Sequence, residues 1–338
     1  MKNLEDFFKK TSQLVDPKIK EVLNLYVDKK TQALVNYQIE TGGKRLRPAL
    51  AMASCLACGG KINDVLYSAV GLEILHNYTL IIDDIIDNSV TRRGQLTTWV
   101  KFGKSIAEFI AMNYSATIFQ TANRSKESNK ISELFTKATK IITDGQILDI
   151  LFEQSGREDE KYVAMNRYKK ITDQNYFEMI SKKTAVLIEA SCEVGGISAR
   201  VEKSQMEALK NYGFNLGIAF QIQDDILDIF GSTKKLGKEV GHDIKRKKLS
   251  NIIILYALKE LPLTEKKKVL NIFKKMEITE KNVRKIIQIV NKTKAKEKAC
   301  LLKEKYIQKA KQSLKQLPQN KWSNILNDIA DFVIEREK

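Results

Sequence analysis

The chain has 338 residues, 43% of them hydrophobic, and a formal net charge of +17. This length and composition exclude a disordered tail and allow one large hydrophobic core or two smaller ones. The positive charge raises nucleic acid, an anionic membrane surface or a polyanionic small molecule as partners. Much of that charge falls after Glu265 in lysine-rich stretches with helical spacing, a pattern typical of a solvated helix face.

The cysteine content and the first residues favour a cytoplasmic protein. Four cysteines and the lack of a charged-then-apolar leader indicate a reducing compartment. Cys55 and Cys58 form a C-x-x-C in an apolar stretch, which favours buried small side chains over a redox site. We expect no transmembrane segment, because no apolar run reaches about 18 residues. Peripheral contact between the basic C-terminal helices and a membrane stays open.

The pattern along the chain predicts an all-α fold. Helix-forming residues dominate, and no run of β-branched residues is bounded by turn signals. Since no long Pro/Gly/Ser linker interrupts the chain, we predict a single domain over residues 1–338. The predicted breaks between helices are residues 41–43, 58–60, 88–94, 155–159, 195–196 and 231–238.

Two apolar helical segments each carry the pattern D-D-x-x-D near their C-terminal ends. The first spans Asp83 to Asp87 and the second Asp224 to Asp228. Residues four apart share one face of a helix, so the outer carboxylates project together and repel each other unless a cation lies between them. Such oxygen ligands suit Mg²⁺, which proteins commonly share with substrate phosphates. One copy alone could be a solvated acidic turn, but two copies favour metal binding.

Basic motifs surround the first acidic cluster. Thr91-Arg92-Arg93-Gly94 follows it, and guanidinium groups suit bidentate donation to phosphate oxygens. Upstream, the stretch from Gly42 to Pro48 joins two glycines to three cations, which suits an anion-binding loop or the basic start of a helix. Each motif is weak on its own.

Further polar residues could contact a diphosphate. His76 lies two helical turns before Asp83 and can share its face. Residues 237–248 form a stretch rich in glycine and lysine that could close over a polyanion and exclude water. The other candidates are Lys183, Thr184 and Gln221.

Together and in this order, the motifs resemble the trans-prenyl diphosphate synthase family, most of all the archaeal-type geranylgeranyl diphosphate synthases. The resemblance runs from about Gly42 to about Ala257. It implies a bundle of long antiparallel helices around a deep apolar cavity, the isoprenoid synthase fold, and a homodimer. It also implies head-to-tail condensation of isopentenyl diphosphate with an allylic diphosphate, through an allylic carbocation and with release of diphosphate.

The resemblance assigns roles to the individual motif residues. The family's Mg²⁺ sites, about three ions per active site with Mn²⁺ as a substitute, fall on Asp83, Asp84, Asp87, Asp224, Asp225 and Asp228. The isopentenyl diphosphate site falls on Lys44, Arg47, His76 and Arg93. The allylic diphosphate site falls on Arg92, Lys183, Thr184, Gln221, Lys238 and Lys248.

The residues before the first cluster predict the length of the product. Tyr78 stands five residues before Asp83 and is followed by the small Thr79, as in archaeal geranylgeranyl diphosphate synthases. We therefore expect a twenty-carbon product, with farnesyl diphosphate or a longer polyprenyl diphosphate as alternatives. The chain departs from the family pattern at Ile82, Met112-Asn113 and Lys247, none of which is a predicted metal ligand.

Other classes of protein fit the motifs less well. A terpene cyclase or a head-to-head condensing enzyme would need neither the second D-D-x-x-D nor Lys44 and Arg47. A non-catalytic subunit of a heteromeric prenyl synthase commonly lacks aspartates that are intact here. A nucleic-acid-binding protein is suggested only by net charge, since no recognition module is evident.

Overall fold

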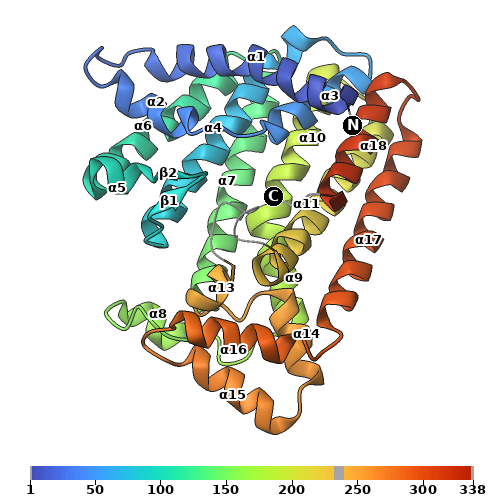
Figure 1. The fold of residues 1–338 in the computed structure, drawn as a ribbon. Coiled ribbons are helices and arrows are strands. Elements are labelled where there is room, and N and C mark those ends of the chain that lie inside the picture. Colours follow the sequence, from blue (N-terminus) through green and yellow to red (C-terminus); the bar gives the residue numbers. More distant parts are fainter. Residues whose placement is uncertain (1, 232–239, 336–338) are drawn as a thin grey trace. The chain divides into compact units, whose positions relative to one another are not determined.

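The structure, a computed structural model, describes residues 2–231 and 240–335. Helices dominate this part of the chain, whose only strands are the short β1 (Thr91–Arg92) and β2 (Gln95–Leu96) (Figure 1). The predicted all-α fold is therefore confirmed. The internal contacts divide the chain into two compact units, and the single domain over residues 1–338 stays a prediction.

The first unit comprises residues 1–140, 186–215 and 309–332. Its described elements are α1 (Lys2–Asn24), α2 (Gln32–Glu40), α3 (Leu46–Ala57), α4 (Ile62–Ile86), the β1–β2 hairpin, α5 (Thr98–Phe102), α6 (Lys104–Asn123), the first part of α7 (Ser128–Leu151), α10 (Val186–Ala199), the start of α11 (Lys203–Phe230), the end of α17 (Ala295–Ser313), the 3₁₀ turn η2 (Leu314–Gln316) and most of α18 (Lys321–Glu335).

Helix α4 forms the centre of the first unit, where it packs against α3, α6 and α10. Its apolar residues face these neighbours, and Val65, Leu72 and Leu75 are fully buried. By length and hydropathy α4 alone among the described helices could cross a membrane, but 61% of its apolar window is buried inside the protein. That degree of burial is typical of a core helix, and the helix carries the first acidic cluster at its C-terminal end.

The predicted break at residues 195–196 is wrong, because α10 continues through both glycines. A β-carbon at Gly195 would lie 2.5 Å from the carbonyl oxygen of Ala51 and 2.5 Å from Cβ of Ser54. The glycine therefore allows α10 and α3 to pack closely, which offsets its helix penalty of about 1 kcal/mol relative to alanine. The breaks at 41–43, 58–60, 88–94 and 155–159 do separate helices, whereas residues 232–238 lie outside the described residues.

The second unit comprises residues 141–185, 216–308 and 333–338. Buried aromatic and branched residues, among them Phe152, Tyr176 and Ile252, fill its core. Its described elements are the ends of α7 and α11, α8 (Lys161–Asn166), α9 (Asp173–Ile180), the π-helical turn η1 (Ser181–Ala185), α13 (His242–Lys245), α14 (Ile252–Glu260), α15 (Leu263–Phe273), α16 (Glu280–Val290) and most of α17.

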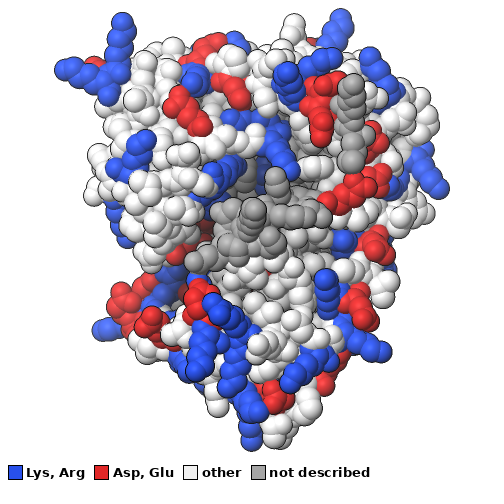
Figure 2. Space-filling model, in the orientation of Figure 1, with Lys and Arg blue, Asp and Glu red and all other residues white. Residues whose placement is uncertain are grey.

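The basic stretches after Glu265 lie on amphipathic helices, as predicted. In α15 and α16 the lysines Lys267, Lys268 and Lys285 are exposed, while Val269 and Ile286 are buried. Figure 2 shows Lys and Arg side chains spread over this part of the surface. Contact of these helices with a membrane stays a prediction.

Candidate active site

The first acidic cluster lies at the C-terminal end of α4, and its middle aspartate is bound by an arginine. Asp84 is 1% exposed, and the Arg92 guanidinium donates to both of its oxygens, with Nε–Oδ2 and Nη2–Oδ1 distances of 2.9 and 2.8 Å. Asp83 and Asp87 lie one turn apart on the same helix and are half-buried. The outer pair therefore has the geometry predicted for metal ligands, while Asp84 holds Arg92.

The Arg93-Gly94 dipeptide forms the tight turn of the β1–β2 hairpin. Arg93 has φ +54° and Gly94 φ +75°, and Arg92 pairs with Gln95 across the two-residue loop. Positive φ at both central residues is the signature of a type I′ turn. Arg92 points to Asp84, whereas the adjacent Arg93 donates to the carbonyl of Gly42 in the basic loop. The hairpin thus links the acidic cluster to that loop.

The predicted isopentenyl diphosphate residues gather around the same part of the first unit. Burial and the charges of Arg47 and Arg93 lower the pKa of His76 well below its usual value, so this imidazole is neutral at pH 7 and lies close to both arginines. The Lys44 ammonium lies 4.5 Å from the ring centroid of Phe332 in α18. The charges of Arg47 and Arg93 thus act on His76, while Lys44 is exposed and lies over Phe332.

In the second unit, Lys183 and Lys248 meet at a buried aspartate that the sequence analysis missed. The ammonium of Lys183 lies 2.6 Å from Oδ2 of Asp149, and that of Lys248 contacts the same oxygen. The two lysines hold the pKa of Asp149 well below its usual range despite its burial, and burial lowers the pKa of Lys248. Two predicted diphosphate-binding lysines are thus fixed by one carboxylate.

Glycines let the turn η1, which carries Lys183 and Thr184, pack closely on its neighbours. A β-carbon at Gly217 in α11 would lie 2.5 Å from Cα of Ala185, and one at Gly145 in α7 would meet the backbone of Lys183. A π-helical turn is rare and occurs often at functional sites. Close packing on both sides therefore supports an unusual backbone where phosphate contacts are predicted.

The second acidic cluster is embedded in protein hydrogen bonds. Asp225 is buried and accepts from the Tyr176 hydroxyl, the Gln221 amide and the Ile252 backbone N–H, each at 2.9 Å. Burial and the nearby Asp243 raise its pKa to about 8. Asp224, three residues after Gln221 on α11, is half-buried.

Asp228 is the last aspartate of the second cluster and caps helix α13. Its carboxylate accepts from the backbone N–H groups of His242 and Asp243, at 3.0 and 3.2 Å, at the start of α13. The side-chain amide of Gln221 joins the second cluster to η1, because it donates to Asp225 and its oxygen accepts from the Thr184 hydroxyl at 2.7 Å. The structure therefore connects Thr184, Gln221 and the second cluster, whereas the predicted contact Lys238 lies outside the described residues.

Two departures from the family pattern now have a structural context. Lys247, where a glycine is expected, has φ +60°, a left-handed conformation that costs a non-glycine residue about 1–2 kcal/mol. Its ammonium donates to the carbonyl of Met276 at 2.8 Å. Met112 is 63% exposed on α6. Nothing in the structure explains Ile82.

The donor set suits magnesium of the kind shared with a substrate. The described residues contain no group of three or more His, Cys, Asp or Glu side chains arranged to hold a metal alone. Mg²⁺ keeps several waters and is commonly bound by one or two carboxylates together with substrate phosphates. The pair Asp83 and Asp87, one helical turn apart, provides that number of ligands.

A helical fold with two aspartate-rich clusters, the first of them bound by an arginine suited to phosphate oxygens, is typical of an isoprenoid synthase. The chain belongs to the polyprenyl synthetase family, which it matches over residues 28–290. It is 37% identical over 278 residues to the short chain isoprenyl diphosphate synthase of Methanocaldococcus jannaschii, covering 81% of this chain and 80% of that one. The geranylgeranyl diphosphate synthase of Saccharolobus solfataricus is 34% identical over 305 residues, with coverage of 88% and 87%.

Solved structures agree with this assignment. The crystal structure of geranylgeranyl pyrophosphate synthetase from Pyrococcus horikoshii superimposes with a TM-score of 0.87 at 32% identity, over 99% of each chain. A polyprenyl synthase from Caulobacter crescentus, complexed with calcium and isoprenyl diphosphate, gives a TM-score of 0.86 at 27% identity, over 99% of this chain and 98% of that one. The predicted enzyme class, a trans-prenyl diphosphate synthase, is confirmed.

Proposed function

We propose that this prenyltransferase condenses isopentenyl diphosphate with an allylic diphosphate and releases geranylgeranyl diphosphate, a twenty-carbon product. One observation carries the proposal: Arg92 binds Asp84 of the acidic cluster, while the next residue, Arg93, joins the basic loop at Gly42. The first unit therefore carries two neighbouring candidate anion sites, one suited to a metal-bound diphosphate and one whose described residues hold no carboxylate pair for a metal. A condensing enzyme needs both, whereas a terpene cyclase needs only the first.

The proposed roles combine these two sites of the first unit with the motif residues that the family resemblance assigns. The cation site binds the diphosphate of isopentenyl diphosphate through Lys44, Arg47, His76 and Arg93. The allylic diphosphate is bound by Arg92, Lys183, Thr184, Gln221, Lys238 and Lys248. Because His76 is neutral, it contributes a hydrogen bond rather than a charge.

Asp83, Asp87 and Asp224 are the proposed Mg²⁺ ligands. Asp84, predicted as a ligand from the sequence, acts through Arg92, and Asp225 and Asp228 shape the second cluster through their hydrogen bonds. When bound, Mg²⁺ neutralises charge on the departing diphosphate. The arginines and lysines do the same through charge-assisted hydrogen bonds, and no side-chain nucleophile is required.

The twenty-carbon product is supported by residues one to two turns below the acidic cluster. Tyr78 and Thr79 are half-buried on α4, and five residues of helix place Tyr78 about 7.5 Å along the axis before Asp83. The Thr79 hydroxyl donates to the carbonyl of His76 at 2.8 Å. A large ring at this depth limits how far a growing chain extends, and the archaeal relative from Saccharolobus solfataricus is named for the same product.

We also propose that the enzyme is a homodimer formed through α6. Phe109, Met112 and Phe119 are 67%, 63% and 57% exposed, and their spacing places them on one side of that helix. Exposed aromatic residues in a row are typical of a protein interface. Replacing Phe109 and Phe119 by Asp should give monomers in analytical ultracentrifugation, and dimers of unchanged affinity would refute the proposal.

A cytoplasmic location is consistent with the state of the thiols. All four cysteines are free, and burial raises the pKa of Cys55 to about 12 and that of Cys58 to about 11. Such thiols are poor nucleophiles and react slowly with oxidants. Fractionation of cells that express the full chain tests the location directly.

The decisive experiment supplies purified protein with radiolabelled isopentenyl diphosphate, Mg²⁺ and, in separate reactions, dimethylallyl, geranyl or farnesyl diphosphate. The dephosphorylated products are then sized by chromatography. A twenty-carbon alcohol supports the whole proposal. A fifteen-carbon or longer alcohol would keep the reaction but overturn the assignment of Tyr78. No product from any primer would favour a subunit that requires an active partner.

A further inference from the structure

Arg45 stands in the middle of the basic loop but does not face solvent as its neighbours do. It is 4% exposed, in contrast to the exposed Lys44 before it. It is also the residue that precedes α3, in a left-handed conformation with φ +53°. That conformation costs a non-glycine residue about 1–2 kcal/mol, so other contacts must hold it.

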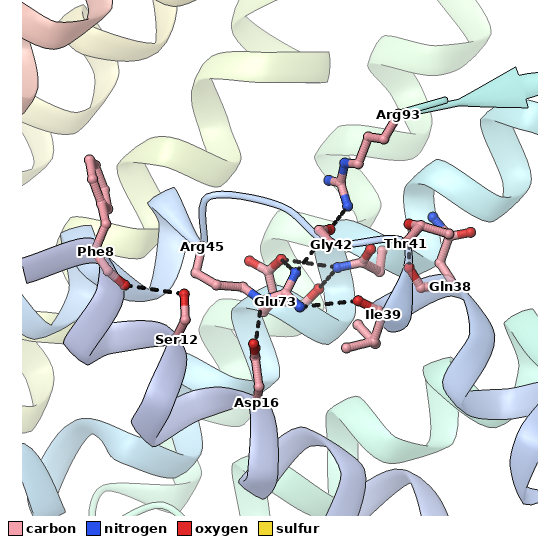
Figure 3. Close-up of polar contacts among 11 residues, drawn as sticks. Phe8, Ser12, Asp16, Gln38, Ile39, Thr41, Gly42, Arg45, Glu73 and Arg93 are labelled. Carbon is pink, nitrogen blue, oxygen red and sulfur yellow. Dashed lines mark hydrogen bonds and ion pairs between the residues drawn. The ribbon is translucent and has the colours of Figure 1, made fainter. Parts of the chain in front are cut away.

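The Arg45 guanidinium binds acceptors from four different segments (Figure 3). Its Nε donates to Asp16 of α1 at 2.6 Å, and its Nη1 donates to Glu73 of α4 at 3.1 Å. The remaining bonds go to the carbonyls of Ile39 in α2 at 3.1 Å and Gly42 at 3.3 Å. A planar fork of five N–H donors suits such a set of acceptors, and a lysine could not reproduce it.

Glu73 is the partner that connects Arg45 to the cation site. This carboxylate is 2% exposed and lies one turn before His76 on α4. Besides Arg45, it accepts from the Asn77 amide at 3.2 Å. A buried negative charge here repels an incoming diphosphate unless a cation neutralises it. Arg45 supplies that cation from the protein, so the neighbouring cations are left to the substrate.

The loop glycines are held between Arg45 and Arg93. A β-carbon at Gly43 would lie 3.0 Å from Nη1 of Arg93 and 3.1 Å from Nη1 of Arg45. Both guanidinium groups also donate to the carbonyl of the preceding Gly42 (Figure 3). The position of Arg45 therefore determines where the Arg93 guanidinium can lie.

We propose that Arg45 is a positioning residue for the isopentenyl diphosphate site. By binding Asp16, Glu73 and the loop carbonyls, it fixes the loop that carries Lys44 and Arg47 and neutralises Glu73. It does not itself contact the substrate. This inference rests on the proposed function, because it assumes that Lys44, Arg47 and Arg93 bind isopentenyl diphosphate.

The test compares four variants by steady-state kinetics: Arg45→Gln, Arg45→Lys, Glu73→Gln and the double variant Arg45→Gln/Glu73→Gln. Arg45→Gln should raise KM for isopentenyl diphosphate about 10- to 100-fold, with kcat and KM for the allylic diphosphate changed less than about threefold. Arg45→Lys should recover part of the loss, since it restores charge but not the fork. The double variant should bind isopentenyl diphosphate more tightly than Arg45→Gln, because the uncompensated charge is gone.

A second readout separates positioning from general destabilisation. Equilibrium dialysis with radiolabelled isopentenyl diphosphate alone, without Mg²⁺, should show the same order of affinities. Asp16→Asn, at a partly exposed side chain, removes the charge of one partner of Arg45 and should raise the dissociation constant about threefold. Arg200→Gln, which breaks an exposed ion pair with Glu127, is the matched control. It should change neither the dissociation constant nor KM for isopentenyl diphosphate.

The outcomes distinguish this inference from the proposed function. If Arg47→Gln weakens binding of isopentenyl diphosphate and Arg45→Gln does not, the positioning role of Arg45 is wrong. The proposed isopentenyl diphosphate site is then still supported. Equal increases in both KM values for Arg45→Gln, or no gain from the double variant, would also overturn it. If Arg47→Gln has no effect in an active enzyme, the proposed site fails, and the role of Arg45 fails with it.

Discussion

Gly145 lies directly against the backbone of Lys183, since a β-carbon at residue 145 would come within 2.4 Å of the Lys183 nitrogen. The glycine belongs to α7 and the lysine to the π-helical turn η1, so α7 supports the backbone from which Lys183 and Thr184 project. The same helix provides Asp149, one turn further on, which binds the Lys183 ammonium. Helix α7 thus positions both ends of this side chain.

Gly145→Ala should displace η1 and impair the enzyme more than the fold. Overpacking of this kind costs about 1–3 kcal/mol, and a shift of Lys183 should lower kcat/KM for the allylic diphosphate about 10- to 100-fold. Gly196→Ala is the matched control, because the atoms nearest to its β-carbon belong to the flexible side chains of Leu209 and Met206 rather than to backbone. Equal activity of the two variants would contradict the proposed role of η1.

Asp149→Asn should destabilise the second unit and alter its response to acid. Removing one partner of a buried ion pair costs about 3–5 kcal/mol, measured by urea unfolding at pH 7. The control Asp173→Asn breaks the exposed pair with Lys259, which is worth about 0–1 kcal/mol. If Asp149→Asn lowers the free energy of unfolding no more than Asp173→Asn does, Asp149 is not needed to hold Lys183 and Lys248 in the fold.

The sign of the pH effect follows from the lowered pKa of Asp149. A carboxyl whose pKa is lower in the folded state contributes stability above its unfolded pKa of about 3.9, and this contribution is lost as the pH falls further. Below about pH 4 the wild-type protein should therefore lose stability more steeply than Asp149→Asn. The two unfolding free energies should approach each other at the lowest pH at which both proteins fold.

The first acidic cluster should divide into two kinds of aspartate. Asp83→Asn should raise the Mg²⁺ concentration for half-maximal activity about 10-fold or more, because it removes a ligand. Asp84→Asn weakens the bidentate grip on Arg92, so it should raise KM for the allylic diphosphate with a much smaller change in Mg²⁺ requirement. If both variants need the same Mg²⁺ concentration for half-maximal activity, Asp84 is a metal ligand like Asp83.

Tyr78→Ala should lengthen the product beyond twenty carbons, because it removes a large side chain about 7.5 Å below the acidic cluster. Thr79→Phe should shorten it. Product sizing by reversed-phase chromatography measures both. Tyr67→Ala on the same helix, where the ring packs near Lys18 and Arg124, is the control and should leave the length unchanged. Unaltered length in Tyr78→Ala would place the determinant elsewhere.

The motifs that could be predicted from the sequence were those whose chemistry lies within a few residues. Aspartates four apart in an apolar helix predict paired carboxylates from helical geometry alone, and α4 carries Asp83 and Asp87 in that way. Glycine was less informative, because the same residue ends a helix in one place and permits close packing in another. Gly195 belongs to the second kind, and only the carbonyl of Ala51 against it reveals this.

The residues that escaped prediction are joined to partners far away in the sequence. Asp149 meets Lys248, 99 residues later, and Arg45 meets Asp16, 29 residues earlier. Both are charged residues inside ordinary helical or loop patterns, so local spacing gives no sign that they are buried. The available signal was a charged residue with no residue of opposite charge near it in the sequence, within a segment otherwise rich in core residues, as with Glu73 in α4.

The turn at Arg93-Gly94 also restricts how this region can change in evolution. Arg92 is the last residue of strand β1 and Arg93 the first residue of the turn, so the two adjacent arginines leave the backbone in different directions and reach different neighbours, Asp84 and Gly42. Insertion or deletion of a single residue between Asp87 and Gly94 would move both arginines relative to the turn, so that neither would reach its present partner. Because both turn residues, Arg93 and Gly94, have positive φ, we expect the number of residues in this segment to be under strong selection.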